Sequence, residues 1–248
     1  MATQAADTFR PHAARSARAR RFYVALALFT LVIAFVGFWP TYFGPLLTGA
    51  IDKPAIIHFH AAVYVGWLAI FIAQTTFAAT GRLAWHVRLG RIGIGYGVLV
   101  IGAGLLAGFG MFAIRVEAGD LARAQSNLVG PLLDMIVFAP FFAAAVAYRH
   151  KPELHKRLMI VATTALLIAA VGRMRFLGDP MNNSLLLFVW TSPILLAMGY
   201  DYLRRRIVHP IYLLGLVVLA LEARPTRVLI RESDAWLGFT AWLATVVS

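Results

Sequence analysis

Apolar residues in this chain fall into seven long runs, which shorter polar and charged segments separate. The runs cover residues 22–43, 56–80, 89–114, 128–148, 158–177, 184–200 and 211–230. Most are about twenty residues long, the length at which an α-helix crosses a hydrocarbon layer of about 30 Å. The first run is too long for a signal-peptide core and lacks a small-residue cleavage site. The pattern therefore predicts an all-α integral membrane bundle of seven transmembrane helices.

The two terminal segments differ from these runs. Residues 1–21 are polar and basic, which predicts a tail in front of the first helix. Residues 233–248 are too few to span comfortably, and Trp236, Phe239 and Trp242 suit a helix that lies at the membrane interface. An eighth, short span is the alternative for this segment. The predicted organisation is a tail over 1–21, a transmembrane bundle over 22–232 and an interfacial helix over 233–248.

The composition also indicates a membrane protein. The 248 residues are 60% hydrophobic and 14% charged, whereas soluble domains are about half apolar and about a quarter charged. The formal net charge of +12 would favour nucleic-acid binding if the basic residues shared one surface. They are spread over several loops, so we expect no nucleic-acid partner. The absence of cysteine excludes a disulfide scaffold, thiolate metal ligands and a cysteine nucleophile.

The positive charges indicate an orientation for the predicted bundle. Of the 23 Lys and Arg residues, five lie in the tail, three in 80–92, four in 149–157 and three in 201–209. These segments share one side of the membrane if the spans alternate, and cytoplasmic loops carry an excess of Lys and Arg. We therefore expect a bacterial inner-membrane protein with a cytoplasmic N-terminus and a C-terminus outside. The lipid bilayer is its expected partner.

One glycine-rich run matches a dinucleotide fingerprint but lies in the middle of a predicted span. Residues 102–107 read Gly-x-Gly-x-x-Ala after an aliphatic stretch. That fingerprint requires a strand, a tight turn and a helix N-terminus that faces water. Gly93, Gly97, Gly104 and Gly108 recur at spacings of four, seven and four, so they share one helix face. We interpret them as a small-residue seam for close helix packing.

Two histidines occur in matched segments at the predicted cytoplasmic side. Residues 85–89 and 154–158 both read apolar-His-x-Arg-Leu, a weak internal repeat. A bis-histidine haem requires two histidines from different helices at one depth. His86 and His155 meet this requirement and are candidate cofactor ligands. The alternative is that they are interfacial histidines that cap loop carbonyl groups.

Ionisable residues also lie inside the predicted spans toward the outer side. A charge at such a depth costs at least about 2.5–3.5 kcal/mol, and it generally marks an ion pair or a functional site. We expect Asp134 or Glu222 to pair with Arg173. His58 and His60 open the second run. On a helix they would point about 200° apart, so both can bind one ion only ahead of the first helical turn.

These residues form a second candidate site, in a polar pocket between helices. The candidate metal ligands are His58, His60, Asp134 and Glu222. Arg173 and Gln74, the latter deep in the second run, are candidate cofactor-binding residues. The pocket suits a metal, a quinone head group or a carboxylate substrate. Because both outer histidines lie on one helix, we expect no second bis-histidine haem. A purely structural ion pair is the alternative.

Several of these segments together resemble a known family. They are His58-Phe59-His60-Ala61, Trp67, Gln74, Gly81-Arg82, His86, Leu89-Gly90, residues 152–159, Val208-His209-Pro210 and residues 235–239. Over residues 55–245 the chain resembles uncharacterised bacterial polytopic membrane proteins, a predicted-membrane domain of unknown function. Its His-x-Arg-Leu-Met-type segments are also similar to small membrane proteins that assist cytochrome oxidase assembly. The resemblance implies the topology and a histidine site, and it implies no reaction.

Three functions are compatible with these features, and they leave open whether the protein is an enzyme. The first is a cofactor-binding membrane protein of respiratory or redox metabolism, which holds haem b, a transition metal or a quinone. The second is a small transporter or permease whose buried charges form the pathway, supported by Pro193 and the glycine-rich third run. The third is a structural or assembly subunit of a larger membrane complex, supported by the glycine seam.

Overall fold

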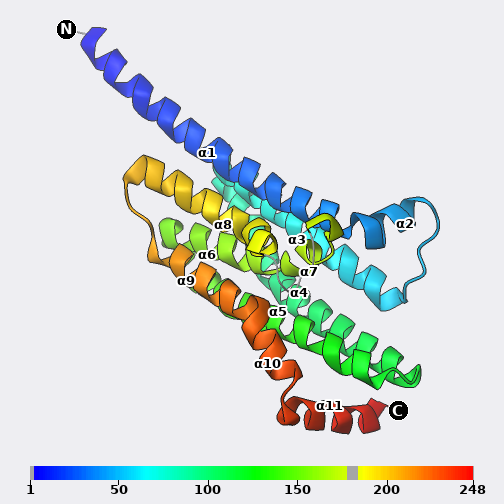
Figure 1. The fold of residues 1–248 in the computed structure, drawn as a ribbon. Coiled ribbons are helices and arrows are strands. Elements are labelled where there is room, and N and C mark those ends of the chain that lie inside the picture. Colours follow the sequence, from blue (N-terminus) through cyan, green and yellow to red (C-terminus); the bar gives the residue numbers. More distant parts are fainter. Residues whose placement is uncertain (1–2, 178–183, 248) are drawn as a thin grey trace.

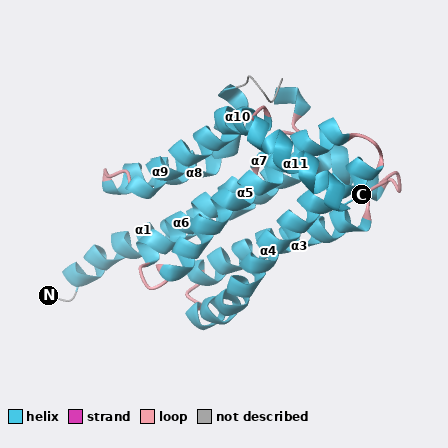
Figure 2. Ribbon diagram, turned by 90° about the horizontal axis from the view of Figure 1, so that it is seen from below, coloured by secondary structure: helices cyan, strands magenta, loops and turns pink. Residues whose placement is uncertain are grey.

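A computed structural model of the chain describes residues 3–177 and 184–247, with side chains over 21–177, 184–223 and 226–247. Every secondary-structure element in these ranges is helical (Figure 2). The elements are α1 (Thr3–Phe38), η1 (Trp39–Phe43), α2 (Gly44–Leu47), α3 (Ala55–Ala79), α4 (Leu83–Glu117), α5 (Leu121–Ala147), α6 (Pro152–Ala165), α7 (Ile168–Val171), η2 (Arg175–Leu177), α8 (Ser184–Arg205), α9 (Pro210–Leu221), η3 (Glu222–Thr226), α10 (Arg227–Arg231) and α11 (Asp234–Val247). The predicted all-α class is confirmed.

Six segments of the described chain are long and apolar enough to cross a membrane. They are Arg21–Leu47, Ala55–Ala79, Leu83–Glu117, Leu121–Ala147, Pro152–Val171 and Ser184–Arg205. They correspond to the first six predicted spans. The seventh predicted run is divided into the 12-residue α9, the π-helical turn η3 and the five-residue α10. The structure therefore supports six membrane-spanning helices, with a shorter, interrupted helix in place of the seventh.

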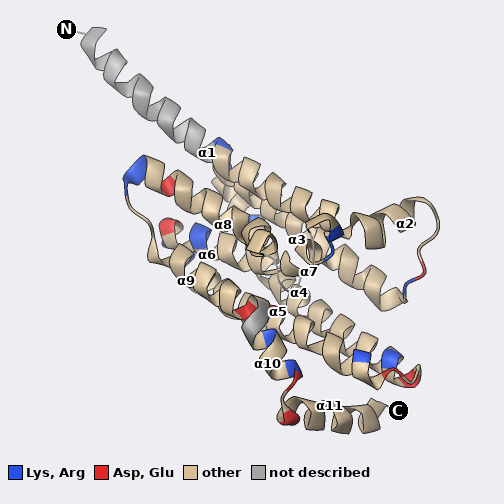
Figure 3. Ribbon diagram, in the orientation of Figure 1, with Lys and Arg blue, Asp and Glu red and all other residues tan. Residues whose placement is uncertain are grey.

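The helices alternate in direction, so their connections gather at two ends of the bundle (Figure 1). We call the end that holds the connections 80–82, 148–151 and 206–209 the amino end, because α1 extends beyond it. The far end holds the connections 48–54 and 118–120. Charged residues of the described chain concentrate toward these two ends and leave the middle of most helices apolar (Figure 3). This distribution is the one that a bilayer requires, since the charged side chains then reach the polar interfaces.

The segment formed by α6 and α7 occupies the centre of the bundle. In its most apolar window 67% of the residues are buried, against 22–44% in the other five candidate spans. Helices at the periphery expose their apolar side chains, which would contact lipid. The break between α6 and α7 is fixed by the neighbouring helix, since Trp190 Nε1 of α8 donates to the Thr164 carbonyl oxygen at 2.8 Å. The central helix is therefore interrupted inside the protein and shielded from lipid.

The glycines of α4 allow close packing on both neighbouring helices. A Cβ atom at Gly97 would overlap the Phe142 ring of α5, one at Gly108 would lie 2.9 Å from Pro131 of α5, and one at Gly104 would lie 2.5 Å from Tyr64 Oη of α3. The predicted seam is confirmed, and helices of the same chain fill it. Residues 102–107 lie inside α4, so the fingerprint-like run has neither the strand nor the turn that dinucleotide binding requires.

The C-terminal helix α11 lies against the far end of α5. Gln125 Nε2 donates to Thr240 Oγ1 at 2.9 Å, and Trp236 Nε1 donates to the Gln125 carbonyl oxygen at 3.1 Å. Two tryptophans of this helix have different surroundings: Trp236 is half-buried on the bundle, whereas Trp242 is exposed. The interfacial position of this helix stays a prediction.

Candidate functional site

The structure divides the sequence-predicted residues between the two ends of the bundle. At the amino end, His86 of α4 and His155 of α6 lie side by side. Their ring centroids are 6.4 Å apart and the ring planes are at 89°. The matched motifs thus bring two imidazoles from different helices close together.

Each of these histidines is held in the same way by the helix before its own. His86 Nδ1 lies 3.2 Å from the Gln74 carbonyl oxygen of α3, and His155 Nδ1 lies 2.8 Å from the Ala145 carbonyl oxygen of α5. A carbonyl oxygen only accepts, so Nδ1 carries the proton in both rings. In a neutral imidazole the other nitrogen, Nε2, then keeps its lone pair. The two rings therefore each present one free ligand atom.

The local sequence explains why the two arrangements match. His86 and His155 are both the fourth residue of their helix. Gly81, with φ of +75°, closes the turn before α4, and Pro152 provides the first residue of α6. Glycine tolerates positive φ and proline is favoured at a helix start, so both turns are short and fixed. The weak sequence repeat therefore corresponds to a repeated helix–turn–helix geometry.

Gln74 belongs to the amino end, which corrects its predicted place in the outer pocket. Its backbone carbonyl orients His86. Its side-chain Oε1 is buried and has no hydrogen-bond partner in the described structure. A buried acceptor without a donor is unfavourable, so this amide is available to a group that is bound beside His86.

A buried charged network that the sequence did not reveal lies next to His155. Arg157 of α6 and Asp201 of α8 are only 2% and 3% exposed, and Arg157 Nε donates to Asp201 Oδ2 at 2.9 Å. Tyr23 and Tyr212 also donate to this carboxylate, at 3.1 and 3.2 Å. Four helices thus converge on one aspartate, and all of its hydrogen-bonding partners come from within the chain.

Glu153 extends this network to the surface. Its carboxylate lies 3.0 Å from Arg157 Nη1, 2.9 Å from Lys156 Nζ and 2.8 Å from Arg205 Nη1. Glu153 therefore forms ion pairs with Lys156 and Arg157, one helical turn further along α6 beside His155, and with Arg205 of α8. The network fixes the turn that presents the imidazole.

At the far end, one arginine is shared by two carboxylates. Arg227 Nη2 contacts Asp134 Oδ1 and lies 2.7 Å from Glu222 Oε1. The expected partner, Arg173, is not in this cluster. Glu222 and Arg227 are five residues apart, and the π turn η3, in which hydrogen bonds join residues i and i+5, brings them to one face. Glu222 Oε2 is buried without a partner among the described groups.

The remaining predicted metal ligands lie apart from this triad and from each other. His58 Nδ1 is 3.0 Å from Tyr42 Oη, whereas His60 Nδ1 is 3.3 Å from the Ala103 carbonyl oxygen. Helix α3 begins at Ala55, so both histidines are already helical and point to different neighbours. Across the described residues, no three His, Asp or Glu side chains are grouped as a metal site. The structure therefore does not gather His58, His60, Asp134 and Glu222 into one ligand set.

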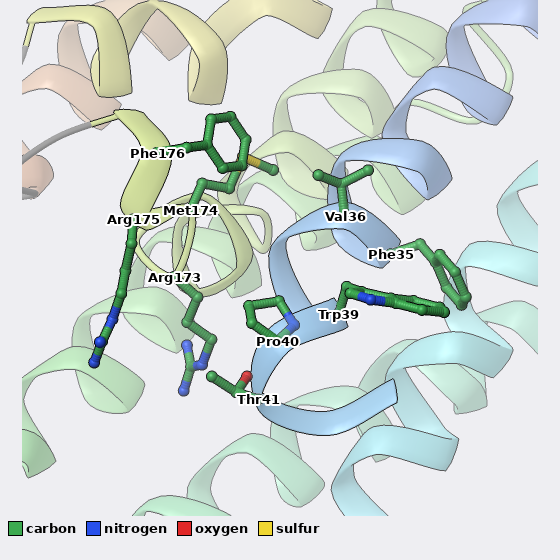
Figure 4. A pocket seen from close by; sticks show the side chains of 9 residues that line it. All are labelled: Phe35, Val36, Trp39, Pro40, Thr41, Arg173, Met174, Arg175 and Phe176. Atoms are coloured by element: carbon green, nitrogen blue, oxygen red, sulfur yellow. The ribbon is translucent and has the colours of Figure 1, made fainter. Parts of the chain in front are cut away.

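A cavity of about 1420 Å³ opens between these far-end groups. Residues of α1, α3, α4, α5 and α8 line it, together with the break between α6 and α7. His60, Asp134, Arg173 and Arg227 all face it. A smaller cavity of about 700 Å³ adjoins Arg173 on its other side, and Figure 4 shows this side chain extending toward Pro40 and Thr41 of η1. Of the residues predicted for the polar pocket, His60, Asp134 and Arg173 line this cavity, whereas His58, Gln74 and Glu222 are not among its described lining residues.

No protein-family model, curated protein or solved structure matches the chain. The geometry of the two ends is therefore what indicates a function for this chain.

Proposed function

We propose that this protein is a membrane redox protein that holds one metal centre between His86 and His155. The separation of the two rings is the observation that carries the proposal. Two imidazoles on opposite sides of one metal, with metal–nitrogen bonds of about 2.0–2.1 Å, have ring centroids about 6 Å apart. The observed separation is 6.4 Å.

The hydrogen bonds of both rings support the same proposal. Histidine ligands commonly donate their second ring N–H to a carbonyl or carboxylate, which fixes the tautomer and the ring orientation. His86 and His155 each make such a bond through Nδ1. Both Nε2 atoms are thereby left for a metal, and neither ring has to change its tautomer.

The small number of protein ligands favours haem iron over a bare metal ion. Zinc sites in proteins use three or four protein ligands, and no third His, Asp or Glu joins this pair in the described chain. Haem iron needs only axial ligands from the protein, because the porphyrin supplies the other four. A haem held by His86 and His155 would supply one-electron transfer. The Gln74 and Ala145 carbonyl oxygens would orient the two imidazoles.

An absorption spectrum of the protein purified in detergent, with haem and metal quantification, tests this proposal. We expect about one haem per chain and a Soret band. His86→Ala and His155→Ala should each lose most of it. His150→Ala is the matched control and should leave the spectrum unchanged, since His150 is an exposed histidine in the connection that precedes α6. A protein that binds neither haem nor a stoichiometric metal when both are supplied would contradict the proposal.

A permease is the second candidate, and the broken helices favour it. The central segment is interrupted between α6 and α7, and the seventh predicted run contains the π turn η3. Both interruptions border the far-end cavity. Secondary transporters commonly form their substrate sites at such discontinuous helices. Flux into proteoliposomes that Asp134→Asn abolishes, measured on protein without haem or metal, would favour this candidate.

We propose that the chain is a member of the membrane family that its histidine segments resemble, and that it resides in a bacterial inner membrane. The basic segments support a cytoplasmic amino end, and the 22 residues of α9, η3 and α10 would then form a seventh span.

The assembly-subunit hypothesis loses the glycine seam as support, because α3 and α5 already occupy it.

A further inference from the structure

The far-end cavity has the size of a site for a lipid-like molecule. Its volume of about 1420 Å³ exceeds the range of about 300–1,000 Å³ that is usual for small-molecule sites. Much of its lining is apolar and includes Trp67, Leu68 and Val65 on α3 and Leu31 on α1. A hydrocarbon chain would pack against this part of the wall.

The charges that line the cavity are unbalanced. Among the described residues that line it, Lys53, Arg115, Arg173 and Arg227 are basic, whereas Asp134 alone is acidic. Asp134 is already paired with Arg227. None of the other three cations forms a salt bridge with a described residue. The cavity therefore carries an excess of positive charge that an anionic ligand would neutralise.

Arg173 is the strongest anchor for such a ligand. Its guanidinium lies over the Phe38 ring, 4.9 Å from the ring centroid, and Nη1 donates to the Ala169 carbonyl oxygen of the preceding turn. Its remaining N–H groups have no hydrogen-bond partner among the described residues, and Arg173 lines both cavities. Arg173 lies two residues beyond the candidate span Pro152–Val171 and is exposed, so its guanidinium is accessible to a ligand, and its planar fork suits a carboxylate or phosphate.

We propose that this cavity binds an anionic amphiphile, with its acidic head group at Arg173 and its hydrocarbon chain along the apolar wall beside Trp67. A free fatty acid and an anionic phospholipid of the bilayer share this chemistry. The site is separate from the His86–His155 pair, so this proposal and the redox proposal can fail independently.

Fluorescence quenching by brominated lipids tests the site, because Trp67 lines the cavity and is only 2% exposed. Three probes are compared on the purified full chain: a brominated fatty acid, brominated phosphatidylglycerol and the brominated fatty alcohol. We expect saturable quenching by at least one of the two acidic probes, and much weaker quenching by the alcohol. Trp67→Phe should remove the saturable component.

Variants at Arg173 then separate the head-group contact from the tail contact. Arg173→Gln should raise the dissociation constant of the acidic probe about tenfold or more, the effect expected for loss of a charge-assisted hydrogen bond. Arg173→Lys should recover part of the affinity. Arg123→Gln is the matched control, since Arg123 is exposed on α5 and lines neither cavity.

Each result decides the proposal. Arg173-dependent quenching by the fatty acid supports it and identifies a free acid as the ligand, whereas the same result with phosphatidylglycerol alone supports it and identifies a bilayer lipid. Equal quenching by the alcohol, or affinity that Arg173→Gln leaves unchanged, would overturn it. If Arg173→Gln fails to fold, Ala61→Phe on the apolar wall replaces it. This change should weaken binding of the acidic probe, and unchanged binding would count against the proposal.

Discussion

The two ends of the bundle both bury charge, but they balance it differently. At the amino end, the Asp201 carboxylate accepts hydrogen bonds from Arg157, Tyr23 and Tyr212. At the far end, Glu222 Oε2 has no described partner and Arg173 forms no salt bridge with a described residue, beside a large cavity. A fully satisfied network holds helices in place, whereas an incompletely satisfied one beside a cavity is suited to binding.

The largest effect on stability should come from the amino end. Arg157→Ala would leave Asp201 buried without its cationic partner, and we expect the free energy of unfolding in detergent micelles to fall by about 3–5 kcal/mol. Chemical denaturation followed by tryptophan fluorescence measures this change. The double variant Arg157→Met, Asp201→Leu is the control, because an apolar pair restores much of the stability when no charge is left unpaired. An Arg157→Ala protein of unchanged stability would show that this network does not hold the helices.

A smaller difference in stability should separate two tyrosines whose hydroxyl groups form hydrogen bonds at opposite ends. Tyr23→Phe removes a hydrogen bond to the Asp201 carboxylate and should cost about 1.5–3 kcal/mol, whereas Tyr42→Phe removes one to the His58 ring and should cost about 0.5–1.5 kcal/mol. Thermal unfolding of the two variants in the same detergent ranks them. The comparison fails if Tyr42→Phe is the more destabilising of the two.

The smallest effect should come from neutralising the incompletely paired carboxylate. Glu222→Gln leaves Arg227 with Asp134 as its partner. It also removes the charge of a carboxylate whose Oε2 accepts no hydrogen bond from a described group, so we expect the free energy of unfolding to change by less than about 1 kcal/mol. Asp201→Asn is the matched change at the amino end and should cost at least about 1.5 kcal/mol, because a fully used carboxylate is lost there. Denaturation midpoints of the two variants provide the test. Equal losses would remove the distinction between the ends.

The apolar runs predicted six of the spans because their length alone determines whether a helix can cross a membrane. The glycine seam was also predictable, because its spacing places Gly97 and Gly108 on one face whatever the neighbouring helices are. The His86–His155 pair followed from two matched motifs. These features share one property: each is a local pattern, and the fold only has to bring neighbouring hairpins together.

The partners in the buried ion pairs were not predictable, because they are not set by a local pattern. Asp201 directly follows the apolar run 184–200 and lies close to three arginines, so the sequence suggests a surface residue. Its burial depends on α6 and α9, which pack against α8. Arg227 is 93 residues away from Asp134. Its place beside Glu222 depends on the π turn, since regular α-helical geometry would put residues five apart on different faces. Partner choice among buried charges is set by tertiary packing, which one sequence does not display.

The matched turns before α4 and α6 have a consequence for how the histidine pair forms. Each imidazole is aligned by a carbonyl oxygen of the adjacent helix in its own hairpin, α3–α4 for His86 and α5–α6 for His155. Each hairpin can therefore set the rotamer of its histidine before the two hairpins associate. Only their docking is then required to bring the two Nε2 atoms together, so the order of assembly in the bilayer would not alter the alignment of either ring.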